Sequence, residues 1–263
     1  MKIRTLVQAL EAWAPPAAAE SYDNTGLLTG NPESTATGVL INLDMTEEVV
    51  LEAVARGCNL VVAHHPIWFM PRKRLTPDDY VSRAIIAAIK HDIALYAIHT
   101  NLDNIRSGVN ARMAAQLGLL DTTLLQPHPK TPEAGAWGAG MIGYLPVPLS
   151  PPDFLQYVKT RFQCGGIRYA AAPLQQIHLV AVCGGAGSFL TEAARRQGAH
   201  AFMTADITYH KFFDNENSLY LLDIGHHESE QFTSQLLHDF LSEKFPTFGV
   251  HLSAVYTNPV RYC

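Results

Sequence analysis

Short apolar runs alternate with helix-type patterns along nearly all of the 263 residues, and this alternation limits the fold more than any other feature. Runs rich in Val, Leu and Ile predict buried strands, and strands that alternate with helices are typical of α/β proteins. The first half predicts strands at 38–43, 60–63 and 93–98, and helices at 4–14, 78–91, 108–118 and between Thr46 and Gly57. The second half predicts strands at 140–145, 177–183, 200–204, 218–223 and 249–255, and helices at 152–162, 186–198 and 230–243.

A Pro-rich stretch separates these two passages and marks the expected division of the chain. Residues 119–137 show no clean period, which is typical of a linker or crossover. They include Pro127, Pro129, Pro132 and Gly135. A chain of 263 residues is near the limit for one hydrophobic core and suits two smaller ones. We therefore predict the α/β class, with a first lobe at residues 1–125 and a second lobe at residues 126–263.

Composition narrows the classes of partner and compartment. The formal net charge is -5 and the densest basic cluster is Arg72-Lys73-Arg74, so a duplex-DNA partner is disfavoured. The four cysteines form no C-x-x-C pair, which is typical of reduced thiols in a cytoplasmic protein. No apolar stretch approaches the length of a membrane span, so no membrane partner is expected.

The first polar cluster, Ala63-His64-His65-Pro66, directly follows a predicted strand. Ligand-bearing loops are common at the carboxyl ends of strands in α/β folds. Within an ideal strand, adjacent side chains point to opposite faces, but a turn before Pro66 would let two neighbouring imidazoles each reach a different metal ion. The ordinary alternative is one histidine in the core beside one exposed histidine.

Two further clusters also follow predicted strands. His99 and Asp103 come after 93–98, where they could bind a metal or support its ligands, although Asp103 could equally be a turn residue. In the third cluster, a helix that begins near His226 would place Glu230 on the same face, at a spacing suited to chelation. The alternative is an acidic helix start.

Taken together, the clusters offer three imidazoles and two carboxylates. This donor set suits a pair of divalent cations such as Zn²⁺, Mn²⁺ or Fe²⁺, about 3.5–4 Å apart. To account for the clusters without metal binding, three independent ordinary explanations would be needed, one for each cluster. The predicted ligands are His64, His65, Asp103, His226 and Glu230.

Five motifs occur in a fixed order along the chain: YDNTGLL at 22–28, AHHP at 63–66, HTNLD at 99–103, MTAD at 203–206 and GHHESE at 225–230. This order resembles that of the Ngg-interacting-factor-three-like family, whose members are also known as GTP cyclohydrolase I type 2 homologs. The match covers nearly the whole chain, and the ordered set is specific although each motif alone is weak. Here the family's usual Trp is Tyr22, its usual Tyr is His227, and its Thr-Gly-Asp is Thr204-Ala205-Asp206.

The resemblance implies two similar, intertwined α/β lobes with mixed sheets flanked by helices, with final strands that can cross over between lobes. It also implies a toroidal homohexamer, built as a trimer of dimers, in the compact form that lacks an inserted middle domain. Two divalent cations of unknown identity would bind each subunit. By analogy, His65 and Asp103 would hold one ion, His64 and His226 the other, and Glu230 would bridge them.

A two-metal site suits hydrolysis, because it lowers the pKa of bound water. The resemblance makes the concrete prediction a GTP cyclohydrolase I type 2-like reaction, in which water attacks C8 of the guanine and formate leaves, with His99 as the catalytic proton carrier. One alternative is a metal-dependent phosphohydrolase acting on nucleotides or nucleic-acid ends. The other is a non-enzymatic metal-binding scaffold or regulatory interaction protein.

Further residues could contact a nucleotide substrate. Lys73 follows the His-His loop and could meet an anion, while Asp206 and His210 follow a predicted strand and could line the cavity. The turn at 183–188 lies between a strand and a helix, where backbone amides can bind phosphate. For that turn, close packing of strand on helix is the alternative.

Overall fold

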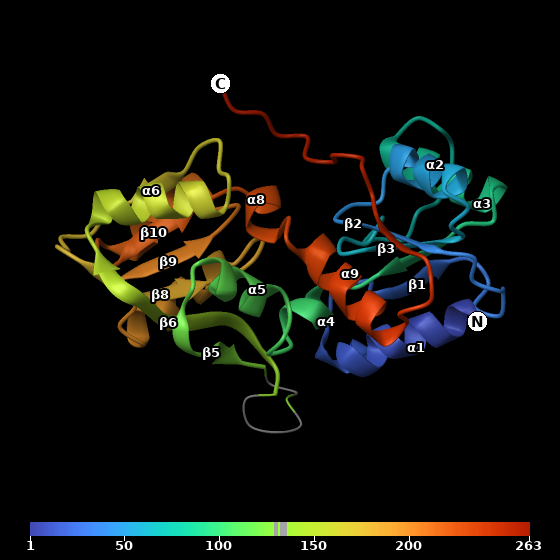
Figure 1. Cartoon of the computed structure of the whole chain (residues 1–263). Coiled ribbons are helices and arrows are strands. Elements are labelled where there is room, and N and C mark those ends of the chain that lie inside the picture. Colours follow the sequence, from blue (N-terminus) through green and yellow to red (C-terminus); the bar gives the residue numbers. More distant parts are fainter. Residues whose placement is uncertain (129–130, 132–135) are drawn as a thin grey trace. The chain divides into compact units, whose positions relative to one another are not determined.

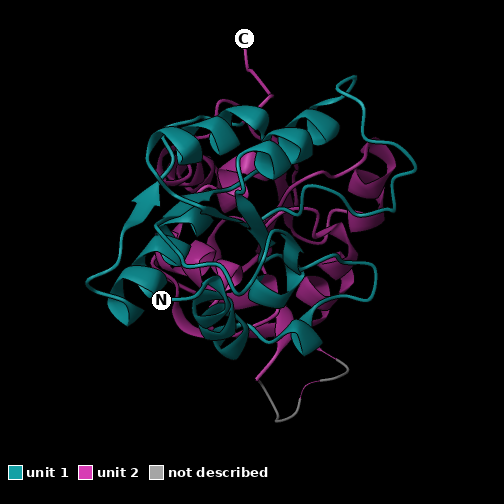
Figure 2. Cartoon of the chain, turned by 90° about the vertical axis from the view of Figure 1, so that its right-hand side faces the viewer, with its two compact units in different colours: residues 1–102, 233–257 teal, residues 103–232, 258–263 magenta. Residues whose placement is uncertain are grey.

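The computed structural model describes residues 1–128, 131 and 136–263, which divide into two compact units. Unit 1 comprises residues 1–102 and 233–257, and unit 2 comprises residues 103–232 and 258–263 (Figure 2). The polypeptide therefore leaves unit 1 after Leu102, re-enters it at Thr233 and leaves it again after Thr257.

Unit 1 is built on a five-stranded mixed sheet whose strands are short and apolar. Strands β2, β3, β4 and β11 run parallel, and β1 pairs antiparallel with β4 at one edge. Parallel strands are usually covered on both faces, and β2, β3 and β4 are fully buried. The spatial order is β1 (Gly26–Thr29), β4 (Ala94–Ala97), β3 (Leu60–Ala63), β2 (Val39–Asn42) and β11 (Val250–Leu252).

Helices cover both faces of this sheet (Figure 1). One face carries α2 (Glu47–Ala55) and α3 (Tyr80–Lys90), and the other carries α1 (Ile3–Trp13) and α9 (Thr233–Lys244). Thr46 is the N-cap of α2, because its side chain accepts a hydrogen bond from the Val49 amide. A single turn, η1 (Pro16–Ala18), follows α1.

Unit 2 is built on a six-stranded mixed sheet. Strands β8, β9 and β10 are parallel and form its centre, and the pairs β5–β6, β6–β8 and β10–β7 are antiparallel. The spatial order is β5 (Leu120–Pro127), β6 (Gly138–Leu149), β8 (Ile177–Val182), β9 (Ala201–Thr204), β10 (Tyr220–Asp223) and β7 (Arg168–Ala170). The helical segments are α5 (Val109–Gln116), α6 (Pro151–Arg161), η2 (Ser188–Leu190), α7 (Thr191–Arg196), η3 (Tyr209–Asn215) and α8 (His226–Glu230).

Two mixed sheets flanked by helices confirm the predicted fold class, but the prediction of a linker at 119–137 is wrong in part. Residues 120–127 form β5, which pairs with β6, and the side chain of Leu125 is buried in the core of unit 2. Pro129, Pro132 and Gly135 lie outside the described residues. The predicted division between residues 125 and 126 falls inside β5, whereas the compact units divide after Leu102.

Other differences concern short elements. The predicted helix at 186–198 is two short segments, η2 and α7, and the short strands β1 and β7 were not predicted. No residue of β1 or β7 is fully buried, so neither strand carries the apolar run by which strands are recognised in a sequence. Among the described residues, no helix is long and apolar enough to cross a membrane.

Candidate metal centre

All three predicted polar clusters follow the carboxyl ends of parallel strands. The His64-His65 pair follows β3 and His99 follows β4, and these two strands are neighbours in the sheet of unit 1. His226 follows β10 in the sheet of unit 2. Parallel strands bring their carboxyl ends to one edge, so loops far apart in sequence meet there.

In unit 1, three imidazoles gather at this edge and are called the unit 1 cluster. One ring nitrogen from each of His64, His65 and His99 lies within 4.8 Å of those of the other two. The ring centroids are 5.0 Å apart for His64 and His65, and 5.1 Å and 5.5 Å from these to His99. His64 is completely buried. The Nδ1 of His64 lies 2.8 Å from the carbonyl oxygen of Ile98, which can only accept, so Nδ1 donates and the neutral ring has its lone pair on Nε2.

A carboxylate orients the second imidazole. The Nδ1 of His65 lies 2.7 Å from Oδ1 of Asp44, and Oδ2 of Asp44 accepts a hydrogen bond of 2.5 Å from the hydroxyl of Thr257. A histidine that gives its Nδ1–H to a carboxylate presents Nε2 as a stronger ligand. Sequence reasoning missed Asp44, although it directly follows Leu43 at the end of β2 and so occupies the same kind of position as the predicted clusters.

His99 is held in the same manner by Asp23. Its Nδ1 lies 2.9 Å from Oδ1 of Asp23, whose other oxygen accepts from the amide and the hydroxyl of Thr100. Burial raises the pKa of Asp23, but the hydrogen bonds and charge from His99 and Thr100 outweigh it and hold that pKa at about 2. The Asp23 carboxylate therefore stays ionised and fixes the ring of His99. In the sequence, Asp23 lies in the motif at 22–28, where it could support a site or simply form a turn.

In unit 2, the predicted spacing of the third cluster is confirmed, because α8 begins at His226 and ends at Glu230. The Nε2 of His226 lies 3.0 Å from Oε2 of Glu230, and its Nδ1 lies 2.7 Å from Oδ2 of Asp206. Burial lowers the pKa of His226, but the charges and hydrogen bonds of Glu230 and Asp206 outweigh it and raise that pKa to about 11. The two carboxylates thus favour a positive charge on the imidazole that lies between them. Asp206, predicted as a substrate residue, accepts this hydrogen bond and orients the ring of His226.

Glu230 is buried, with a side-chain exposure of 3%, and packs against a glycine turn. A Cβ on Gly185 would lie 2.5 Å from Oε1 of Glu230, so only glycine fits beneath the carboxylate. The amides of Gly184 and Gly185 donate to Asn110 and Ser229, at 3.0 Å each. These amides are committed to protein acceptors, which favours the packing interpretation of this turn over phosphate binding.

Asp103 ends the short helix α4 (Thr100–Asp103) and is connected to the same turn. Asn110 donates from Nδ2 to the carbonyl oxygen of Asp103 at 2.9 Å, while its Oδ1 accepts from Gly184. Burial raises the pKa of the Cys183 thiol, and the charges of Asp103 and Glu230 raise it further, which places both carboxylates near one sulfur atom. Asp103, His226 and Glu230 are called the unit 2 cluster.

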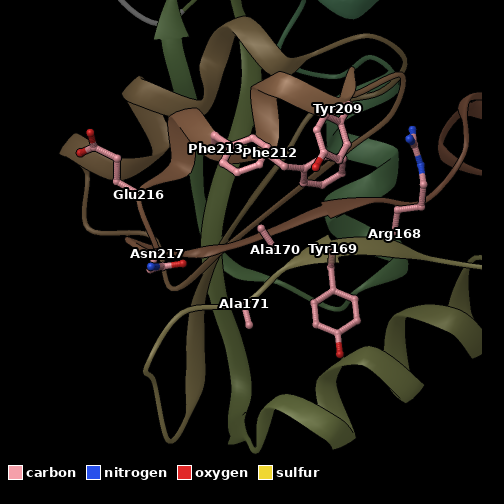
Figure 3. Close-up of a pocket in the computed structure, with 9 residues that line it drawn as sticks. All are labelled: Arg168, Tyr169, Ala170, Ala171, Tyr209, Phe212, Phe213, Glu216 and Asn217. Carbon is pink, nitrogen blue, oxygen red and sulfur yellow. The ribbon is translucent and has the colours of Figure 1, made fainter.

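The two other predicted substrate residues belong to neither cluster. Lys73 is exposed in the loop before α3. His210 lies in η3, with its ring centroid 5.3 Å from that of Tyr209 and 6.4 Å from that of Phe213. The η3 segment and β7 border a cleft of about 530 Å³ (Figure 3). The cleft is lined by Arg168, Tyr169, Ala170, Ala171, Tyr209, Phe212, Phe213, Glu216 and Asn217, which include neither a predicted ligand nor His210.

The donor atoms fit a borderline divalent cation. Imidazole nitrogen and carboxylate oxygen are common ligands of Zn²⁺, Mn²⁺ and Fe²⁺. Bonds of about 2.1 Å place the ligand atoms of one ion about 3–4 Å apart, and the 3.0 Å separation of Nε2 in His226 and Oε2 in Glu230 falls in that range. The described residues therefore include His and Glu groups able to hold a metal ion.

Proteins of known sequence and structure resemble this chain over its whole length. A protein of Streptomyces coelicolor named GTP cyclohydrolase 1 type 2 homolog is 34% identical, with 98% of this chain and 93% of that protein covered. A protein of the same name from Clostridium perfringens is also 34% identical, with 88% and 87% covered. A crystal structure from Staphylococcus aureus matches with a TM-score of 0.90 at 28% identity, covering 100% of this chain and 99% of that chain.

A second structural relative is described as a Bacillus cereus protein related to NIF3, and it matches with a TM-score of 0.91 at 25% identity, covering 100% of this chain and 99% of that chain. The sequence profile of the family described as Duf34/NIF3 (NGG1p interacting factor 3) matches residues 1–259. The resemblance predicted from the ordered motifs is thereby confirmed. The chain belongs to the Duf34/NIF3 family.

Proposed function

We propose that the unit 1 and unit 2 clusters together bind two divalent cations and that the protein is a metal-dependent hydrolase. The observation that carries this proposal is the common orientation of the three imidazole ligands. His64, His65 and His226 each turn Nδ1 toward a protein acceptor, so Nε2 is the nitrogen presented for metal binding. Such acceptors are typical of metal-binding histidines, because they fix the tautomer and the orientation of the ring.

The proposed ligand assignment follows the family resemblance. His65 and Asp103 would hold one ion, and His64 and His226 would hold the other. Glu230 would bridge the two ions, since its buried carboxylate already lies within 3.0 Å of His226. Zn²⁺, Mn²⁺ and Fe²⁺ are all compatible with these ligands.

The expected contribution of Asp44 can be measured directly. Replacing Asp44 with Asn removes the negative charge opposite Nδ1 of His65 while keeping the shape of the side chain. We expect the affinity for Zn²⁺ to fall by about tenfold to a hundredfold, because the imidazole becomes a weaker ligand. Competition with a chromophoric chelator measures this change. Asp78→Asn, at an exposed position, is the matched control, and equal affinities of the two variants would contradict the role of Asp44.

The proposed chemistry needs a water molecule, an electrophile and a proton carrier. When bound, the ions would supply Lewis acidity that lowers the pKa of water and polarises the group under attack. His99 is the proposed proton carrier, because Asp23 fixes its ring and leaves Nε2 to exchange protons. The ionised Asp23 carboxylate would also stabilise the imidazolium that forms when His99 takes a proton.

We propose GTP as the substrate to test first, on the basis of the names of the relatives. One water molecule would add at C8 of guanine and open the imidazole ring to a formamide. A second water molecule would hydrolyse the formamide and release C8 as formate. Protein loaded with Zn²⁺ or Mn²⁺ is expected to release formate from GTP, and a His65→Ala, Glu230→Ala double variant is expected to release none above background. Formate is measured by a coupled dehydrogenase assay, and a dihydroneopterin-type product by its fluorescence.

The other outcomes of that assay distinguish the remaining functions. Release of phosphate instead of formate from nucleotides or nucleic-acid ends would identify a metal-dependent phosphohydrolase. Tight binding of metal without any turnover would identify a metal-binding scaffold or regulatory protein. Equal formate release by the native protein and the double variant would sink the cyclohydrolase proposal.

Family membership also carries the proposals for assembly and compartment. We expect a homohexamer, arranged as a trimer of dimers in a toroid, and light scattering of the purified protein measures its mass directly. A cytoplasmic location is consistent with the reduced cysteines, of which Cys58, Cys164 and Cys183 are buried and Cys263 is exposed.

A further inference from the structure

The chain passes from unit 1 to unit 2 for the last time between Thr257 and Asn258. The two side chains are adjacent in sequence, and each contacts a residue that supports one of the two clusters. The short tail from Asn258 to Cys263 then stays within unit 2.

On the unit 1 side, Thr257 is part of a chain of hydrogen bonds. Its hydroxyl donates to Oδ2 of Asp44 at 2.5 Å, and Oδ1 of the same carboxylate accepts from Nδ1 of His65 at 2.7 Å. Because one oxygen of Asp44 contacts Thr257 and the other contacts His65, the plane of the carboxylate is fixed. Thr257 therefore determines how Asp44 faces His65.

On the unit 2 side, Asn258 is buried and holds Glu228 in α8. Its Nδ2 donates to Oε1 of Glu228 at 3.4 Å, and its Oδ1 accepts from the amide of Val260 at 2.9 Å. Tyr262 also forms a hydrogen bond with Glu228, and its ring packs so closely on Gly165 that a Cβ there would lie 2.3 Å from it. The tail is therefore fitted around this buried carboxylate.

Glu228 is well placed to set the position of the ligands of α8. It lies two residues after His226 and two before Glu230, in a helix of five residues. A helix that short has little intrinsic stability, so its position depends on its contacts. Glu228 is 6% exposed and folds back over Gly225, where a Cβ would lie 2.2 Å from Oε2.

The backbone at Asn258 is also restricted by the residue that follows it. Pro259 follows Asn258, so the conformation of Asn258 is confined to extended geometry, and the ring fixes φ of Pro259 itself. A restricted segment transmits displacement at one end to the other better than a Gly-rich segment does.

We propose that Thr257 and Asn258 form a covalent tie through which the contacts of Asp44 and His65 in unit 1 also restrain α8 in unit 2. This proposal rests on the proposed function, because the coupling matters most if the two clusters share a pair of ions. It assigns a positioning role to two residues that touch no reacting atom. Loosening the tie is expected to loosen α8 even when both side chains are retained.

The test inserts Gly-Ser-Gly between Thr257 and Asn258, which preserves both side chains and removes the fixed spacing. Amide hydrogen exchange of the peptide that contains α8 is measured without metal by mass spectrometry. We expect exchange of α8 to become about tenfold faster, because its opening costs less free energy. The same insertion between Arg74 and Leu75, in an exposed loop of unit 1, is expected to leave α8 unchanged.

A second measurement uses metal. The insertion is expected to weaken binding of Zn²⁺ by about tenfold in a chelator competition, since α8, which carries His226 and Glu230, is held less firmly. Unchanged exchange of α8 in the insertion variant would overturn the tie. If the native protein binds fewer than two cations, the proposed function fails, whereas the exchange of α8 still decides whether the tie exists.

Point variants keep the proposal testable if the insertion prevents folding. Thr257→Val removes the hydroxyl with little change in shape, and Thr257→Ser retains it. We expect Thr257→Val to raise the exchange of α8 in unit 2, although Thr257 belongs to unit 1, and Thr257→Ser to restore native exchange. A Thr257→Val protein whose changes are confined to the Asp44 and His65 region of unit 1 would contradict the tie.

Discussion

Glu230→Gln is expected to lower the bound metal from two equivalents per chain to one or none. Glutamine has nearly the same shape as glutamate but lacks its charge, and a neutral amide is a poor bridge between two cations. The substitution also removes one of the two carboxylates that raise the pKa of His226. Elemental analysis after dialysis against Zn²⁺ or Mn²⁺ measures the metal per chain.

The control for this change is Glu243→Gln, an exposed glutamate on α9. It carries the same change of charge and is expected to retain the native metal content. Retention of both equivalents by Glu230→Gln would show that the bridge is assigned to the wrong residue. Loss of metal by both variants would point to the net charge of the protein and not to the ligand.

The positions of the polar clusters at the strand ends could be predicted from the sequence because they obey local rules. Apolar runs identified β3, β4 and β10, and a polar residue directly after a parallel strand lies at the ligand-binding edge of its sheet. The spacing of His226 and Glu230 needed only the geometry of one helical turn. These inferences depend only on a few neighbouring residues, so they can be made without knowledge of the tertiary structure.

The groups that orient the imidazoles could not all be predicted, because most come from distant parts of the chain. The acceptor for His64 is the carbonyl oxygen of Ile98, and any residue type supplies a carbonyl. Asp23 is 76 residues from His99 and reaches it only through the tertiary fold. Asp44 was the exception, since its place at the end of β2 followed the rule already applied to the other strands.

The missed strands have a related explanation. The apolar residues of β5 do not form a run, and most of its side chains are exposed or half-buried, so its place in the sheet depends on pairing with β6. Strand propensity is strongly context-dependent, and edge strands such as β1, β5 and β7 carry the weakest pattern.

Asp223→Ala is expected to destabilise the protein by about 3 kcal/mol, because it leaves the buried amide of Ile207 and the partly buried amide of Gly225 without an acceptor and removes the partner of Arg168. Asp223 is 5% exposed and ends β10. Its carboxylate accepts from the amides of Ile207 and Gly225, at 2.9 Å and 3.1 Å, and from the guanidinium of Arg168. Three separate segments of unit 2 therefore depend on one side chain.

Loss of Asp223 should also weaken metal binding, since two of those segments carry site residues. Ile207 follows Asp206, which orients His226, and Gly225 precedes His226 itself. Urea denaturation measures the free energy of unfolding, and chelator competition measures the affinity for Zn²⁺. Asp214→Ala removes an exposed carboxylate that pairs only with Lys211 among the described ion pairs, and is expected to change stability by no more than about 0.5 kcal/mol. If Asp223→Ala were as stable as Asp214→Ala, the carboxylate would not organise this end of the sheet, and its position beside the His226 loop would need another explanation.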